Sequence, residues 1–169
     1  MVLTILISIL SLCLNQAPLT EKYHKQVSKN ISKSFSKGSL DLKPIDFRRG
    51  ELSKIYIDKN FQGHILIAEV AACNLGGCSS FENVKKDKNS EYFDLLLILN
   101  KEEEIVTIKI LDYFSDYGYE ITSKNYLKKY LGKQPCDFKN EIDGIDAISG
   151  ATISSYALEG MISTMCEKL

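Results

Sequence analysis

The sequence predicts an α+β domain in which an antiparallel sheet is flanked by helices. Two observations support this fold class. Apolar runs rich in β-formers lie in the middle of the 169-residue chain, whereas helical spacing lies toward its ends. The length suits one domain, and 44% hydrophobic with 25% charged residues is an ordinary globular composition. A net charge of -1 argues against nucleic-acid binding, and no apolar run reaches the length of about 18 residues that a membrane-spanning helix needs.

Residues 1–17 have the character of a signal peptide. The chain is apolar and uncharged from Met1 to Leu14, and small and polar residues follow. A positive start is missing, so a buried first strand or helix is the alternative. We expect export to the periplasm or to the extracytoplasmic face of the membrane. The stretch ending at Cys13 resembles a lipobox apart from Leu12, so a lipoprotein is a second form of the same prediction.

Residues 18–49 are predicted to form a basic amphipathic helix followed by a linker. Between Asn15 and Lys59 there are ten basic and five acidic residues, against eleven and seventeen in the remainder. We favour a solvated helix that covers the domain, and a helix lying on an anionic membrane surface is the alternative. The apolar residues recur every four positions, at Leu19, Tyr23, Val27, Ile31 and Phe35.

The strands and later helices are predicted from periodicity. We expect strands over 54–58, 63–72, 92–99 and 105–111, with a turn at 100–103 that makes a hairpin of the last two. Helical spacing resumes near 124–131 and from Ile153 to the end.

The cysteines allow several interpretations. Cys73 and Cys78 flank a pair of glycines, and export would favour a local disulfide between them. A redox-active dithiol and half of a metal site are the alternatives, but no ligand motif supports a metal, and none is predicted. Cys136 and Cys166 could form a second bridge, which the sequence leaves open. The two histidines, His24 and His64, suit surface or core roles better than catalysis.

The stretch from Asp143 to Ser155 reads as a loop of Gly and Asp running into a helix. Ser149 suits the N-cap, Gly150 and Ala151 allow close backbone approach, and Thr152 falls in the first turn. Free backbone N–H groups and the helix dipole favour a phosphate there, and a hydroxyl at that point could carry a phosphoester. A merely capped helix is the alternative.

The residues Asp146-Ala147-Ile148-Ser149-Gly150-Ala151-Thr152 resemble the Asp-X-X-(Ser/Thr)-Gly-Ala-Thr signature of the FMN-binding domain family. That family includes flavin subunits of the sodium-pumping NADH:quinone oxidoreductase and of the Rnf complex. The resemblance implies that residues 50–169 form an FMN-binding domain. It implies that a flavin transferase joins FMN through its phosphate to Thr152. The residues read by the transferase, and forming the phosphate pocket, would be Asp146, Ser149, Gly150 and Ala151.

The resemblance extends loosely upstream. The segment 112–132 sits where the large subunits carry Glu-Thr-Pro-Gly-Leu-Gly; Glu120 corresponds, whereas Pro-Gly-Leu-Gly is absent. Lys124 could neutralise the phosphate or the reduced flavin. The aromatic residues suited to packing on the flavin ring are Tyr113, Phe114, Tyr117, Tyr119 and Tyr126, of which Tyr117 and Tyr119 are preferred.

A membrane-associated electron carrier is the function that these residues predict, rather than an enzyme with its own small substrate. The sequence has no Gly-X-Gly-X-X-Gly nucleotide fingerprint, so electrons should pass between this protein and other proteins, such as those of a membrane electron-transport complex. No catalytic residue is predicted. The rival functions are a thiol-disulfide redox protein centred on Cys73 and Cys78, and an interaction module whose motif is only a capped helix.

Overall fold

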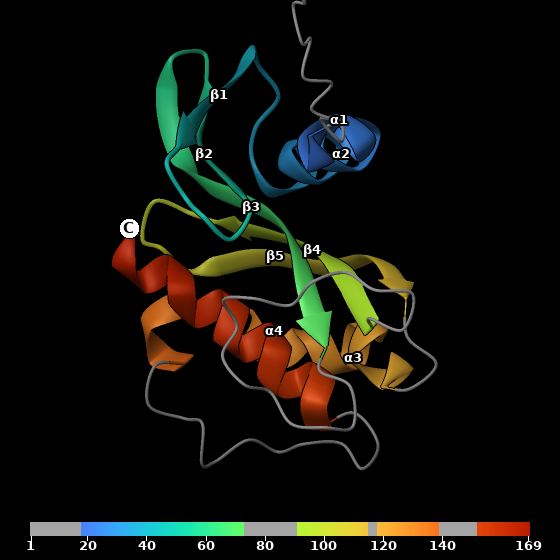
Figure 1. The fold of residues 1–169 in the computed structure, drawn as a ribbon. Helices are drawn as coiled ribbons and strands as arrows, with labels where there is room; N and C mark the ends of the chain where they lie inside the picture. The colour runs from blue at the N-terminus through green and yellow to red at the C-terminus, as the bar shows by residue number, and fades with distance from the viewer. Residues whose placement is uncertain (1–17, 73–90, 115–117, 139–151) are drawn as a thin grey trace, which may run out of the picture.

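The computed structural model describes residues 18–72, 91–114, 118–138 and 152–169. Its described part holds a five-stranded sheet, every neighbouring pair of which is antiparallel, with helices on both faces (Figure 1). This confirms the predicted α+β class. The strands follow chain order across the sheet: β1 (Leu40–Ile45), β2 (Glu51–Ile57), β3 (Asn60–Ala72), β4 (Glu91–Leu99) and β5 (Ile105–Phe114).

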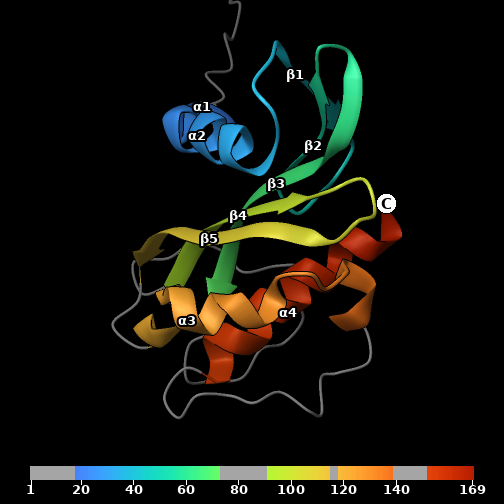
Figure 2. The same cartoon turned by 180° about the vertical axis from the view of Figure 1, so that it is seen from behind.

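The helices divide between the two faces of the sheet, as Figure 2 shows from behind. One face carries α1 (Leu19–Lys22) and α2 (His24–Ser34). The other face carries α3 (Lys124–Leu127) and α4 (Thr152–Thr164). The remaining described helical segments are 3-10 turns: η1 (Tyr119–Thr122), η2 (Lys128–Tyr130), η3 (Pro135–Phe138) and η4 (Met165–Glu167).

The four strands expected from periodicity are all present, and β1 is an additional strand. It lies within 18–49, which the sequence predicted to be helix and linker, and it pairs with β2 from Leu40 opposite Ile57 to Ile45 opposite Leu52. The strand is short, largely exposed and contains Pro44. A proline is tolerated at the edge of a sheet because no ladder hydrogen bond is needed there. These features hide the alternation that would identify β1 in the sequence.

Both faces of the central strands are apolar, which explains why both faces carry helices. Alternate side chains of a strand point to opposite faces. On β4, Leu95 and Leu97 pack toward α4, whereas Leu96 and Ile98 pack toward α2. On the α2 face, the apolar stripe of the N-terminal helices completes a second core, so this basic helix covers the sheet. The stripe residues buried there are Tyr23, Val27 and Ile31.

Polar contacts fasten the N-terminal helices to the sheet. The Glu51 carboxylate accepts hydrogen bonds from the backbone N–H groups of Leu19 and Thr20, at 2.9 Å for Thr20. The Tyr23 hydroxyl contacts the carboxylates of Asp94 and Asp112, the latter at 2.6 Å. Asp94 is only 1% exposed and lies opposite Asp112 on the neighbouring strand. Two further contacts come from the Lys22 ammonium, 2.9 Å from Asp94 and 3.4 Å from Asp112.

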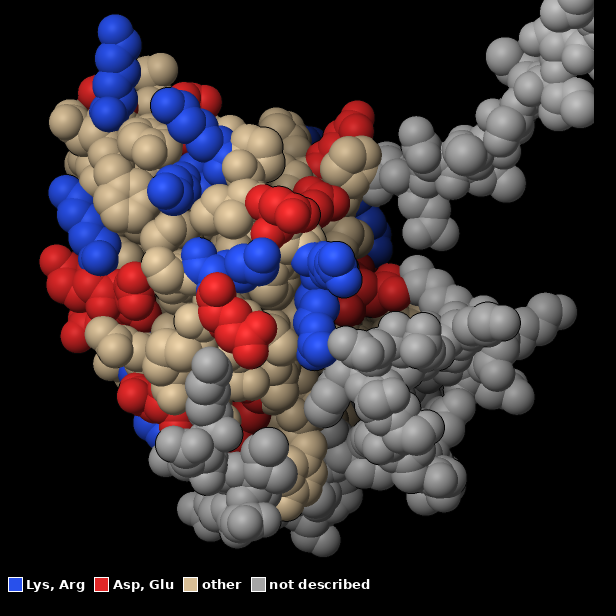
Figure 3. All heavy atoms as spheres, turned by 60° about the vertical axis from the view of Figure 1, so that its left-hand side comes forward, with Lys and Arg blue, Asp and Glu red and all other residues tan. Residues whose placement is uncertain are grey.

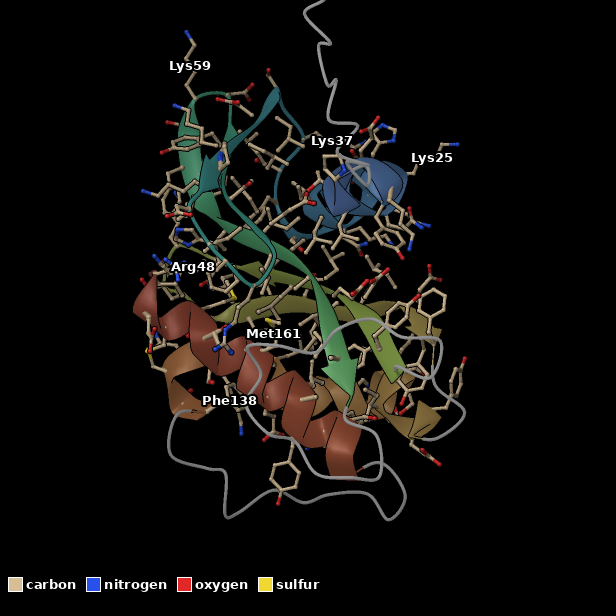
Figure 4. All side chains as sticks on the ribbon, in the orientation of Figure 1. Lys25, Lys37, Arg48, Lys59, Phe138 and Met161 are labelled. Carbon is tan, nitrogen blue, oxygen red and sulfur yellow. A yellow bond between two sulfur atoms is a disulfide. The ribbon has the colours of Figure 1, made fainter. Side chains whose placement is uncertain are left out.

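A disulfide joins Cys136 in η3 to Cys166 in η4, with 30 residues of separation along the chain. The sequence left this pairing open. Closing a loop of this length limits the unfolded chain and stabilises a fold by about 3–4 kcal/mol in the entropic account. The bridge therefore holds the two ends of the segment that contains both α4 and residues 139–151. Phe138 of η3 and Met161 of α4 lie in the same region (Figure 4).

Tyr23→Phe is expected to destabilise the fold, because it takes a hydroxyl partner from the buried Asp94. The expected loss is about 1–3 kcal/mol of unfolding free energy, measured by urea denaturation at neutral pH. Tyr56→Phe is the control, since Tyr56 is half-exposed on β2 and its hydroxyl makes no hydrogen bond within the described residues. It should change the unfolding free energy by about 0.5 kcal/mol or less.

The same pair of variants tests a pH dependence. Burial, with hydrogen bonds to Asp112 and Asp94, raises the pKa of Tyr23 well above its ordinary value of 10.0. The unfolded chain thus releases this proton at a lower pH than the folded one, and stability falls as the pH rises above about 10. The fall should be shallower for Tyr23→Phe than for Tyr56→Phe. Equal slopes would show that Tyr23 does not contribute.

Candidate functional site

The candidate site lies at the beginning of the described part of α4 (Thr152–Thr164), where the motif ends. The backbone N–H groups in the first turn of a helix have no partner within the helix, so this end attracts anions. The helix is long enough, at 13 residues, to carry a substantial dipole. Four motif residues expected at the site, Asp146, Ser149, Gly150 and Ala151, lie outside the described residues, as does the side chain of Thr152.

Three segments converge on the first turn of α4. The Tyr113 hydroxyl, at the end of β5, lies 3.0 Å from Ser154 Oγ in α4. Gly118 fits between them with a φ of 79°, and a Cβ added to it would come within 2.7 Å of Ser154 Oγ and 2.8 Å of the Tyr113 hydroxyl. Only glycine combines this left-handed backbone with so close an approach. Close packing therefore joins three segments: the end of β5, the segment before η1 and the first described turn of α4.

A row of aromatic rings runs from the core to the surface beside this turn. Phe93 is fully buried and stacks on Tyr113, with 5.9 Å between ring centroids. Tyr119 meets Tyr113 edge to face at 5.8 Å and is 69% exposed. An exposed aromatic ring packed against a partly buried one is suited to contact a flat conjugated ligand. Of the two preferred ring contacts, Tyr119 is thus near the start of α4, and Tyr117 lies outside the described residues.

The other aromatic candidates have different surroundings. Phe114 stacks on Tyr92 at 4.5 Å and lies 5.6 Å from the Lys22 ammonium, so it belongs to the α1 side of the sheet. Tyr126 is buried in the core under α4. Glu120 and Lys124 are exposed, in η1 and in the first turn of α3, respectively. Because η1 also carries Tyr119, Glu120 lies next to the exposed ring in sequence.

A series of buried hydrogen bonds joins α4 to the segment formed by α3 and η2. The Tyr130 hydroxyl donates to Glu159 Oε1 at 2.8 Å and lies 3.0 Å from the Tyr126 hydroxyl. Glu159 is 7% exposed, and the Lys129 ammonium lies 3.4 Å from its carboxylate. Burial raises the pKa of Tyr130 far above its ordinary value, which keeps its hydroxyl protonated as a donor.

Sequence reasoning did not find Ser154, Glu159 or Tyr130. Glu159 follows Thr152 by seven residues, which is about two turns of helix. The hydrogen bond to Glu159 therefore also fixes the rotation of the helix about its axis and the position of Thr152 along that axis. An acidic residue on an apolar helix face was the available signal for Glu159. Nothing local identifies its partner Tyr130, which lies 29 residues away in the chain.

Other kinds of site are not evident in the described part of the chain. No group of three or more His, Cys, Asp and Glu side chains there could hold a metal ion. Burial, with the charge of Lys54, lowers the pKa of His64, whose side chain is buried beside Phe61 at the start of β3. None of the helices within these ranges is long and apolar enough to cross a membrane. Cys73 and Cys78 lie outside the described residues.

The described residues form an α+β domain in which the first described turn of α4 lies near an exposed aromatic ring. Residues 90–167 match the family model of the FMN-binding domain. The match supports assigning this part of the chain to the FMN-binding domain family, with FMN as its ligand. The match includes β4, β5, α3 and α4, whereas α1, α2 and β1–β3 precede it. No curated protein and no solved structure matches the chain.

Tyr130→Phe is expected to loosen α4, because Glu159 loses its buried hydroxyl donor. The expected cost is about 1–3 kcal/mol of unfolding free energy, measured by urea denaturation. Tyr156→Phe is the control, since Tyr156 lies on the same helix and is exposed. A loss in Tyr156→Phe as large as that in Tyr130→Phe would contradict this account of the network.

Proposed function

We propose that this protein is an extracytoplasmic electron carrier whose FMN is joined through its phosphate to the Thr152 hydroxyl. The observation that carries the proposal is that the motif ends at Thr152, on helix α4, within the segment that matches the FMN-binding domain. A flavin transferase is the partner required for this attachment. Redox proteins, such as those of a membrane electron-transport complex, are the partners that would supply and accept electrons.

The described residues fit FMN in two respects. The N-terminal end of a helix favours a phosphate through its backbone N–H groups and dipole, and the exposed Tyr119 ring lies beside Tyr113, which with Gly118 packs on the first described turn of α4. Lys124, in the first turn of α3, is an exposed positive charge that could offset negative charge on a reduced flavin. Flavins supply electron transfer in one or two steps, and the protein contributes binding, orientation and access. Its own residues would hold the phosphate and cover one side of the ring.

Thr152→Ala is expected to abolish covalent attachment, because no side-chain oxygen remains to form the phosphoester. The protein is co-expressed with a flavin transferase, separated on a denaturing gel and viewed under ultraviolet light. The wild type should fluoresce and Thr152→Ala should not. Thr164→Ala is the control, since Thr164 ends the same helix and its hydroxyl bonds only within that last turn. A dark wild-type band would refute the attachment.

Tyr119→Ala tests the proposed ring contact separately from the tether. In the Thr152→Ala background, FMN can bind only reversibly, and its dissociation constant can be measured by fluorescence titration. Loss of an aromatic contact worth about 0.5–1.5 kcal/mol should weaken binding by roughly 2–10-fold. Tyr56→Ala, on β2, serves as the control and should leave the constant unchanged. Equal dissociation constants for FMN in the Tyr119→Ala and Tyr56→Ala variants would show that Tyr119 does not contact the flavin.

A further inference from the structure

A stripe of lysines runs along the outer side of α2. Lys25, Lys29 and Lys33 follow one another at intervals of four residues, and all three are exposed. Side chains four apart lie on the same side of a helix, so the three ammonium groups form one row with about 12 Å of helix between its ends. The buried side of the same helix is formed by Val27 and Ile31. Its lysines therefore face solvent while its apolar residues face the sheet.

No ion pair neutralises these charges among the described residues. None of the ion pairs between described residues includes Lys25, Lys29 or Lys33. A fourth lysine, Lys109 on β5, adds to them, because the end of α2 meets β5 where Ser34 Oγ lies 2.9 Å from Thr107 Oγ1. Burial, with the charges of Lys33 and Lys29, lowers the pKa of Lys109. Two elements thus contribute to one region of positive potential.

Positive charge is concentrated in the N-terminal segment of the chain. Residues 19–37 contain five lysines and a single acidic residue, Glu21, although the whole chain has a net charge of -1. On the face turned forward in Figure 3, by contrast, basic and acidic side chains are interspersed. Interspersed charges largely cancel beyond a Debye length, whereas a row of one sign attracts an extended anionic surface.

We propose that the lysine stripe, defined as Lys25, Lys29 and Lys33, binds the surface of a bilayer that contains anionic phospholipids. The binding is electrostatic, because the apolar side of α2 is committed to the sheet and cannot insert between acyl chains. A straight row on one helix can meet a flat surface with all its ammonium groups at the same time. Lys25 points away from the α2 ribbon into solvent (Figure 4).

The position of α2 favours lipid over an acidic redox partner. The cores beneath α2 and α4 lie on opposite faces of the sheet, so the lysine stripe and the start of α4 are separated by the sheet (Figure 2). A redox partner bound at the stripe would be kept away from the candidate flavin site. A bilayer bound there leaves that site free. The choice of lipid over a redox partner rests on the proposed flavin site, whereas the placement of the lysines alone carries the binding of an anionic surface.

The test is sedimentation of the full-length protein with vesicles. Vesicles of phosphatidylcholine alone are compared with vesicles that contain phosphatidylglycerol. Each lysine near an anionic surface contributes about 1 kcal/mol, so Lys25→Gln/Lys29→Gln/Lys33→Gln should lower the partition coefficient for anionic vesicles by roughly 100-fold. Lys101→Gln/Lys128→Gln/Lys168→Gln is the matched control, because it removes the same charge from exposed lysines elsewhere. Residues 1–17 are common to all forms, so their contribution is the same in each.

Circular dichroism first establishes that both triple variants are folded. The proposal requires that the control binds anionic vesicles nearly as the wild type does, and that binding weakens at high salt. Equal losses in the two triple variants would overturn it, because net charge would then explain the binding. Wild-type binding that ignores phosphatidylglycerol would overturn it too. Retention on polyglutamate without vesicle binding would assign the stripe to an acidic protein instead.

Discussion

The structure depends on one constraint, which is that the central strands of the sheet are apolar on both faces. The side chains of β3 and β4 alternate between two cores, with Leu66 and Leu95 on one side and Ile65 and Leu96 on the other. Leaving either face in water would forgo about 25 cal/mol for each Å² of apolar surface. The chain therefore needs a helical layer on each side. Helix α2 covers one face of the sheet and α4 covers the other.

This constraint assigns different roles to the two helical layers. On the α2 side, contacts with Glu51 and Asp94 fasten the start of the domain, and the outward lysines remain available for the proposed lipid contact. On the α4 side, the helix is fixed at two levels. Ser154 meets Tyr113 in its first turn, and Glu159 meets Tyr130 about two turns below Thr152. A helix start held this firmly can present a tethered cofactor in a defined orientation.

The segment 90–167, which matches the family model of the FMN-binding domain, includes two of the five described strands. Strand β4 pairs with β3 along nine residues, so the matched segment shares its sheet with the part that precedes it. The N-terminal region is therefore more than a linker to the flavin domain. It supplies β1–β3, and α2 covers the second face that β4 exposes. The two parts fold on one sheet and share its cores.

Much of the fold followed from the sequence because periodicity is local. Apolar runs identified four strands, the four-residue spacing identified the N-terminal helix, and the residues from Asp146 to Thr152 identified the family and the start of α4. The edge strand β1 was not predicted, because its exposure and Pro44 remove the alternation of apolar and polar residues that identifies a strand. Backbone pairing with β2 holds β1 in place, and this pairing does not require a periodic pattern of side chains.

Tertiary structure alone decided which distant residues meet. The contacts that define the site join Tyr113 to Ser154 across 41 residues and Tyr130 to Glu159 across 29, and Cys136 pairs with Cys166 across 30. Each pair is created when α4 packs on the sheet, and no local spacing encodes it. The sequence by itself determined the chemistry available at Thr152. The packing of both faces of the sheet determined where that chemistry lies and which side of the molecule the lysines occupy.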